Sequence, residues 1–183
     1  MEKKMSGALR IATWFQSGLI RPVLFRGMAG TYGSFFALPF CLLVLVTARK
    51  FGTTIGNDMA IYFYATVCLA IFFSGMLVVP TAELELGPRT DWKGKTKERD
   101  QNEIVIDEVF GMLISCIPLL FVAELTVIHF VIAFLFFRFF DIVKIPPTRF
   151  FDRMKNAFGV MTDDFIAGIY TAIVLNLCIR YIL

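Results

Sequence analysis

Two pairs of adjacent acidic residues each stand at the start of an apolar stretch of this chain. The first pair is Asp107 and Glu108, and the second is Asp163 and Asp164. A carboxylate at the edge of hydrocarbon is costly unless a cation neutralises it, so such pairs mark an ion or substrate site by default. Oxygen-only ligands favour a hard ion such as Mg²⁺. We therefore expect these four residues to bind Mg²⁺, with Asp100 as a fifth ligand.

Two basic residues and a glycine-rich helix start supply groups that bind phosphate. Arg138 and Asp141 are three residues apart, as are Asp141 and Lys144, so the three project from roughly one helix face. Arg138 would bind a phosphate through two parallel hydrogen bonds, and Lys144 would add a positive point charge. Thr31 and Ser34 lie beside Gly30 and Gly33, where hydroxyl and backbone N–H groups would meet the same anion. This pattern predicts a phosphate held next to a metal site.

Structural roles compete with these functional interpretations. A glycine-rich helix start is more often only a helix cap. The alternative for the acidic pairs is that they form ion pairs with Arg138 and Lys144 that merely hold helices together. Both alternatives stay open at the level of the sequence.

The residues available in this chain limit which nucleophile or base the reaction could use. The single histidine, His129, falls at the far end of a predicted span from every acidic pair, which disfavours histidine as base or nucleophile. Metal-assisted attack by water remains, or attack by an Asp carboxylate. The predicted catalytic residues are Asp107, Glu108, Asp141 and Asp164, where Asp141 orients Arg138 or accepts a proton.

The elements that position these residues are membrane helices. The 183 residues are 57% hydrophobic, include 21 Phe, and have a mean hydropathy of +0.71, which a soluble domain of this size could not bury. A helix needs about 20 mostly apolar residues to cross a bilayer. The stretch 109–143 would be roughly 52 Å long as one helix, so we expect it to turn near 123–126. The sequence predicts one all-α bundle of five spans, near 32–48, 61–79, 104–122, 127–143 and 165–183.

The orientation follows from the distribution of Lys and Arg, which are retained in cytoplasmic segments. Five lie in the N-terminal segment 1–31, five in the loop 80–103 and four in the loop 144–164. These regions should be cytoplasmic, with the N-terminus inside, and the candidate site residues then fall at the cytoplasmic level. The net charge of +3 is explained by this topology and predicts no nucleic-acid partner.

Two further patterns concern how helices pack. Gly111 follows Asp107 by four residues and Gly168 follows Asp164 by four, which predicts that neighbouring backbones approach closely beside the acids. In the N-terminal segment, apolar residues recur at helical spacing, which predicts a short helix that lies on the membrane surface or packs against the bundle. These are Ala8, Ile11, Ala12, Phe15 and Leu19.

The residues of the candidate site fall in four blocks that follow one another along the chain. The blocks are Gly30-Thr31-Tyr32-Gly33-Ser34; Asp100 with Ile104-Val105-Ile106-Asp107-Glu108 and Gly111; Phe137-Arg138-Phe139-Phe140-Asp141-Ile142 with Lys144; and Gly159-Val160-Met161-Thr162-Asp163-Asp164 with Ala167-Gly168. Together they resemble the bacterial phosphatidylglycerophosphatase A family. The resemblance implies a Mg²⁺-dependent inner-membrane enzyme that converts phosphatidylglycerophosphate to phosphatidylglycerol and phosphate. Where the family usually has Pro and Lys-Pro-x-Pro, this chain has Met28-Ala29 and Lys144-Ile145-Pro146-Pro147, and no charged group is lost.

Two other functional classes are compatible with charged residues in a membrane protein. A transporter would need polar residues through the depth of the bilayer, yet the predicted span 61–79 is almost purely apolar. A non-catalytic scaffold with structural ion pairs would use the mixed-charge segment 81–99 for docking, although such a segment is more often a solvated linker.

Overall fold

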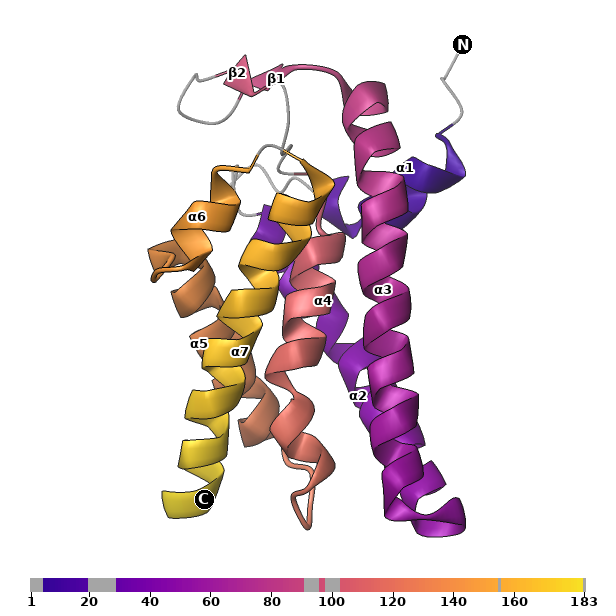
Figure 1. Ribbon diagram of the computed structural model, residues 1–183, viewed down its shortest axis with the longest axis vertical. Helices are drawn as coiled ribbons and strands as arrows, with labels where there is room; N and C mark the ends of the chain where they lie inside the picture. The colour runs from indigo at the N-terminus through magenta and orange to yellow at the C-terminus, as the bar shows by residue number, and fades with distance from the viewer. Residues whose placement is uncertain (1–4, 20–28, 91–95, 98–102, 155, 183) are drawn as a thin grey trace.

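The computed structural model shows a bundle of helices that run along one long axis (Figure 1). The structure describes residues 5–19, 29–90, 96–97, 103–154 and 156–182. In these residues the only strands are β1 (Arg89–Thr90) and β2 (Thr96–Lys97), which pair antiparallel. The helices are α1 (Gly7–Ala12), η1 (Ser17–Leu19), α2 (Ala29–Ile55), α3 (Asn57–Leu86), α4 (Ile106–Ser115), η3 (Ile117–Leu120), α5 (Val127–Val143), α6 (Thr148–Asp152) and α7 (Ala157–Tyr181). The described part of the chain is therefore almost entirely helical, as predicted.

Three helices of the described chain are long and apolar enough to cross a membrane, namely α2, α3 and α7. They contain the predicted spans 32–48 and 61–79 and most of the span 165–183. Each helix is longer than the apolar run that predicted it, because the polar residues at the ends of the run continue the helix without a break. The five-span count and the cytoplasmic N-terminus stay predictions.

The predicted third span differs most from the structure. Helix α4 ends at Ser115, and the chain then tightens into η3, which has Pro118 in its first turn, where a proline lacking an N–H is tolerated. The predicted third span, 104–122, is thus a ten-residue α-helix followed by a 3₁₀ turn. Helix α5 then starts at Val127, where His129 Nδ1 accepts a hydrogen bond from the backbone N–H of Thr126 (3.2 Å).

Helix α4 is the most enclosed helix of the bundle. Every residue from Val109 to Ser115 is buried, and α4 packs against α2, α3, α5 and α7 (Figure 1). The acidic residues in its first turn would be costly against lipid, and the surrounding helices shield them from it. The short central helix therefore holds the first acidic pair in a fixed position relative to four other helices.

Glycines bring α4 and α7 together, as predicted from their spacing to the acids. A Cβ atom at Gly168 would lie 2.6 Å from the backbone oxygen of Gly111 and 2.9 Å from Ile114 Cβ. A Cβ at Gly111 would lie 2.9 Å from the backbone oxygen of Asp164 and overlap the Phe137 ring. The two backbones are thus too close for any side chain at these positions, and this contact sets the distance between the two acidic pairs.

Replacing Gly168 with Ala should destabilise the bundle. The added methyl group would force α4 and α7 apart, which costs about 1–3 kcal/mol, more than the gain of roughly 1 kcal/mol in helix propensity. Gly7→Ala is the matched control, because Gly7 is also helical and has no atom within 4 Å of its Cβ position. We expect a lower midpoint of thermal unfolding in detergent for Gly168→Ala only; equal midpoints for the two variants would contradict the close contact.

The N-terminal helix packs against the bundle. Leu9 and Ala12 are buried, α1 contacts α3, and the Ser6 hydroxyl donates to a carboxylate oxygen of Glu85. The predicted helical face is only partly correct, because α1 ends at Ala12 and Phe15 lies in a turn of left-handed backbone. Sequence spacing alone could not show this, because the apolar pattern continues through the turn.

Candidate active site

Three carboxylates from two helices meet at one end of the bundle. Asp107 and Glu108 lie in the first turn of α4, and Asp164 lies in α7; one oxygen of each falls within 4.8 Å of the other two. The side chains of Asp107 and Asp164 are only 8% and 4% exposed. We refer to these three residues as the acid cluster.

The acid cluster has the chemistry of a divalent-cation site. Three carboxylates this close repel each other, and a cation bound between them or a proton shared among them relieves the repulsion. Glu108 Oε2 is buried and has no hydrogen-bond partner among the described residues, so it has an acceptor position left for a ligand. Oxygen donors alone suit Mg²⁺ or Ca²⁺ rather than a soft metal. The donor set therefore fits the predicted Mg²⁺.

The first turn of α2 lies directly against the acid cluster. A Cβ at Gly30 would overlap Glu108 Oε1 and lie 3.2 and 3.3 Å from Arg138 Nη1 and Nη2. Ser34 Oγ donates to the Gly30 carbonyl (2.9 Å), and Thr31 is half-buried in the same turn. Only glycine allows the helix backbone to approach a carboxylate and a guanidinium this closely. For Gly30 the sequence predicted only an anion-binding role in the glycine-rich helix start.

Arg138 is held in place by two partners and keeps one donor unused. Its Nη1 lies 2.9 Å from Asp141 Oδ2 and donates to Ser34 Oγ at 3.2 Å. Its Nε is buried and lacks a hydrogen-bond partner within the part of the chain that the structure describes. The guanidinium is therefore fixed beside Glu108 with hydrogen-bonding capacity available for an anion.

Lys144 has a different environment from Arg138. Its Nζ donates to Asp163 Oδ2 (2.8 Å) and to Asp152 Oδ1. Burial opposes the charge of Lys144, but these two carboxylates outweigh it and hold the pKa of the ammonium above its usual range. These two ion pairs join the end of α5 to α6 and α7. This is the structural role, holding helices together, that the sequence left open.

Asp163 and Asp164 have separate partners although they are adjacent. Neighbouring side chains on an α-helix point about 100° apart, so one faces Lys144 when the other faces the acid cluster. Asp163 Oδ1 also accepts a hydrogen bond from the backbone N–H of Asp164 (3.0 Å). The structure thus places Asp107, Glu108 and Asp164 together and Asp163 beside Lys144; Asp100, the fifth predicted ligand, lies outside the described residues.

The four segments that the sequence predicted to converge do so at one end of the bundle. Helices α2, α4 and α7 begin there and α5 ends there, at the upper end of Figure 1. Helix α5 begins at the opposite end, so His129 is far from the acid cluster, as expected. Asp152 was missed, because only the position of the short helix α6 brings it to Lys144.

Comparison with known proteins places this arrangement in a family. Residues 10–179 match the model of the family described as phosphatidylglycerophosphatase A. A phosphatidylglycerophosphatase A of Haemophilus influenzae is 32% identical over 167 residues, which cover 90% of this chain and 83% of that protein. A putative phosphatidylinositol-3-phosphatase of Bacteroides thetaiotaomicron is 38% identical over 78 residues, 42% of this chain and 47% of that protein. No solved structure matches the chain.

Proposed function

The chain belongs to the phosphatidylglycerophosphatase A family, and on that premise we propose that it hydrolyses the terminal phosphomonoester of phosphatidylglycerophosphate with Mg²⁺ at the cytoplasmic face of the inner membrane. The observation that carries the proposal is the acid cluster beside Arg138 at one end of membrane-spanning helices. A lipid phosphate lies at the membrane surface, so a site at the end of the bundle meets the phosphate while the acyl chains stay in the bilayer.

Each side chain has a role that follows from its surroundings. Asp107, Glu108 and Asp164 would hold the ion, which would supply neutralisation of phosphate charge and activation of water. Arg138 binds the phosphate with its positive charge and its unused Nε donor. Asp141 and Ser34 orient the guanidinium, so little side-chain entropy is lost when the phosphate binds.

Lys144 is assigned a positioning role in this proposal. Two carboxylates already occupy its ammonium, and it holds α7 at the level where Asp164 faces the acid cluster. Asp163 then contributes to the Mg²⁺ site through the position of α7 and not as a ligand.

The orientation rests on charge. Cytoplasmic retention of Lys and Arg would place the cationic segments 1–31, 80–103 and 144–164 inside. Helices α2, α4 and α7, which start within or just after these segments, begin at the end of the bundle that carries the acid cluster. Substrate added outside inverted membrane vesicles would therefore be hydrolysed, and substrate added outside right-side-out vesicles would not.

The test is phosphate release from phosphatidylglycerophosphate by the purified protein in detergent. We expect release with Mg²⁺, loss of release after chelation with EDTA, and recovery when Mg²⁺ is added back. Phosphatidate and phosphatidylinositol 3-phosphate, tested in parallel, should be hydrolysed more slowly. A protein that binds the lipid and releases no phosphate would support the transporter or scaffold alternative, and release that resists chelation would contradict the metal site.

A further inference from the structure

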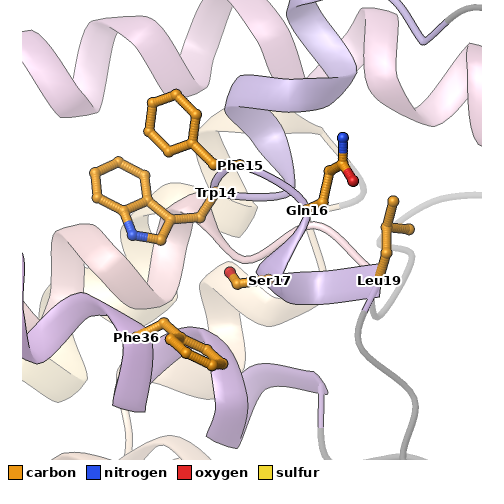
Figure 2. Close-up of a pocket in the computed structure, with 6 residues that line it drawn as sticks. All are labelled: Trp14, Phe15, Gln16, Ser17, Leu19 and Phe36. Atoms are coloured by element: carbon orange, nitrogen blue, oxygen red, sulfur yellow. The ribbon is translucent and has the colours of Figure 1, made fainter.

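A recess lies between the turn that follows α1 and the first half of α2. It has a volume of about 570 Å³, within the range of roughly 300–1,000 Å³ that small-ligand sites occupy. Three aromatic rings and a leucine line it together with an amide and a hydroxyl; the residues are Trp14, Phe15, Gln16, Ser17, Leu19 and Phe36 (Figure 2). We call it the aromatic pocket. Its lining is mostly apolar with a few polar groups, as in sites that bind amphipathic molecules.

The turn that forms one wall has an unusual backbone. Trp14, Phe15 and Gln16 have φ angles of 46°, 53° and 75°, a conformation that residues other than glycine rarely adopt. Hydrogen bonds hold the turn, since the N–H of Phe15 donates to the Arg10 carbonyl (2.7 Å), and the Trp14 ring packs edge-on against Phe40 with centroids 4.9 Å apart. Such backbone persists only where its surroundings fix it, and here it presents the ring of Phe15 with 73% of the residue exposed.

The aromatic pocket is separate from the acid cluster. Phe36 follows Ser34 by two residues, so the two side chains leave α2 about 200° apart. Ser34 faces Arg138, and Phe36 faces the turn after α1 (Figure 2). The aromatic pocket and the acid cluster therefore lie on different sides of α2.

The pocket nevertheless adjoins the segment that leads into α4. The backbone N–H of Val105 donates to the Ala12 carbonyl (2.9 Å). A Cβ at Gly18 would overlap the backbone oxygen of Glu103 and lie 3.0 Å from Val105 Cγ1. The turn thus touches the chain just before Asp107, and filling the pocket would hold the entry to α4 in place.

We propose that the aromatic pocket binds the glycerol-ester region and upper acyl chain of one bilayer phospholipid, distinct from the substrate. Phe36 lies seven residues into α2, about 10 Å along a helix that is long and apolar enough to span the membrane, so the pocket is at the depth where ester groups meet acyl chains. Trp is enriched at this depth because its ring is apolar and its N–H is polar. Gln16 and Ser17 add groups of the kind that ester oxygens bind, and phospholipid is the molecule that surrounds a membrane helix here.

Tryptophan fluorescence can report on this pocket directly. The chain has two tryptophans, Trp14 and Trp92, so Trp92→Phe leaves Trp14 as the single emitter. The Trp92→Phe protein in excess detergent is titrated with phosphatidylethanolamine that carries bromine on its acyl chains, which quenches nearby indole rings. We expect quenching that saturates at on the order of one lipid per protein, because such sites are few per protein. Quenching that rises in proportion to the lipid in the micelle would overturn the proposal.

Two adjacent phenylalanines provide a matched pair of variants in the same background. Phe36 lines the pocket and Phe35 does not. Both residues are exposed, Phe36 by 42% and Phe35 by 57%, so they differ mainly in their contact with the pocket. Phe36→Ala should raise the midpoint of the titration by about tenfold, and Phe35→Ala should leave it unchanged. Phe15→Ala, at an exposed position that cannot disturb the core, should also raise it. Equal midpoints in all variants would overturn the assignment of the pocket.

A competition experiment separates the second lipid from the substrate. Unbrominated phosphatidylglycerophosphate, added with EDTA so that it is not consumed, should restore Trp14 emission no better than unbrominated phosphatidylethanolamine does. Selective displacement by phosphatidylglycerophosphate would assign the pocket to the substrate and overturn the proposal of a second lipid. The measurement needs no turnover, so its outcome does not depend on the proposed phosphatase activity.

Discussion

Replacing Asp164 with Asn should lower the rate of phosphate release by about 1,000-fold or more while the protein stays folded in the membrane. Asn keeps the shape of Asp and removes its charge, so the acid cluster loses one of three anionic ligands. A bound metal supplies several kcal/mol of transition-state stabilisation, and each 1.36 kcal/mol lost is a factor of ten in rate. Phosphate release from phosphatidylglycerophosphate at saturating Mg²⁺ gives the rate, and isothermal titration of the detergent-solubilised variant with Mg²⁺ should show weakened binding.

The neighbouring residue provides the sharpest comparison for this variant. Asp163 is equally buried and equally acidic, but it faces Lys144, so Asp163→Asn should weaken the ion pair between α5 and α7 and keep most of the Mg²⁺ affinity. Asp58→Asn, at an exposed position in the first turn of α3, is a control for the loss of one aspartate outside the site. Full activity in Asp164→Asn would contradict the metal site, and equal loss of Mg²⁺ binding in the Asp163 and Asp164 variants would contradict the division between them.

The division between adjacent acids shows what the sequence could predict and what it could not. The pairs themselves are visible, because charge next to an apolar run is rare and costly. Which member of a pair faces the site depends on the rotation of α7 about its axis. That rotation is set by contacts such as Gly168 against Gly111 and Lys144 against Asp163, which join residues distant in sequence. The glycine contact was predicted from spacing within each helix. An ion pair between Lys144 and an acidic pair was left open as an alternative, but the sequence did not show that Asp163 is the partner.

Helix ends show a similar limit. Apart from Pro118, the run 104–122 gives no signal that α4 stops at Ser115, because apolar residues continue through η3 although only Leu119 of that turn is buried. The turn at Trp14 to Gln16 is invisible for another reason. Its residues are not those that favour left-handed backbone, so tertiary contacts impose the conformation against local preference. By contrast, α5 has the predicted bounds, because Thr126 and His129 cap its start locally.

Gly30 illustrates why the approach of α2 to the site could not be read from the sequence. A glycine-rich helix start suggests backbone N–H groups aimed at an anion. In the structure the glycine has a steric role, since its missing side chain lets Glu108 and Arg138 lie against the helix. A glycine at this position is therefore explained by steric clearance, whereas the sequence suggested anion binding. Only the distances to Glu108 and Arg138 distinguish these two roles.

Arg138 is the second residue whose loss should be severe. Replacing it with Gln should lower kcat/KM by about 1,000-fold, because arginines that stabilise transferring phosphoryl groups contribute roughly 10³–10⁵ to the rate. The loss should fall on kcat as well as KM, since a fixed guanidinium fits the geometry and charge distribution of the transferring phosphoryl group better in the transition state than in the ground state. The Ser34 and Asp141 contacts fix the guanidinium in advance, so its charge and its unused donor are already in position when substrate binds.

Arg138→Lys distinguishes the geometry of the guanidinium from its charge. Lysine restores the positive charge beside Asp141 and cannot bind two oxygens in a planar fork, so activity should be intermediate between those of the wild type and Arg138→Gln. Arg49→Gln is the matched control, because Arg49 donates to the Ala123 carbonyl and lies near the far end of α2. Arg49→Gln should leave kcat/KM within about twofold of the wild type, as for surface changes away from a site. Full activity of Arg138→Lys would show that a point charge is enough and that the planar guanidinium is not needed. Full activity of Arg138→Gln would show that phosphate binds without an arginine, and the assignment of Arg138 would be wrong.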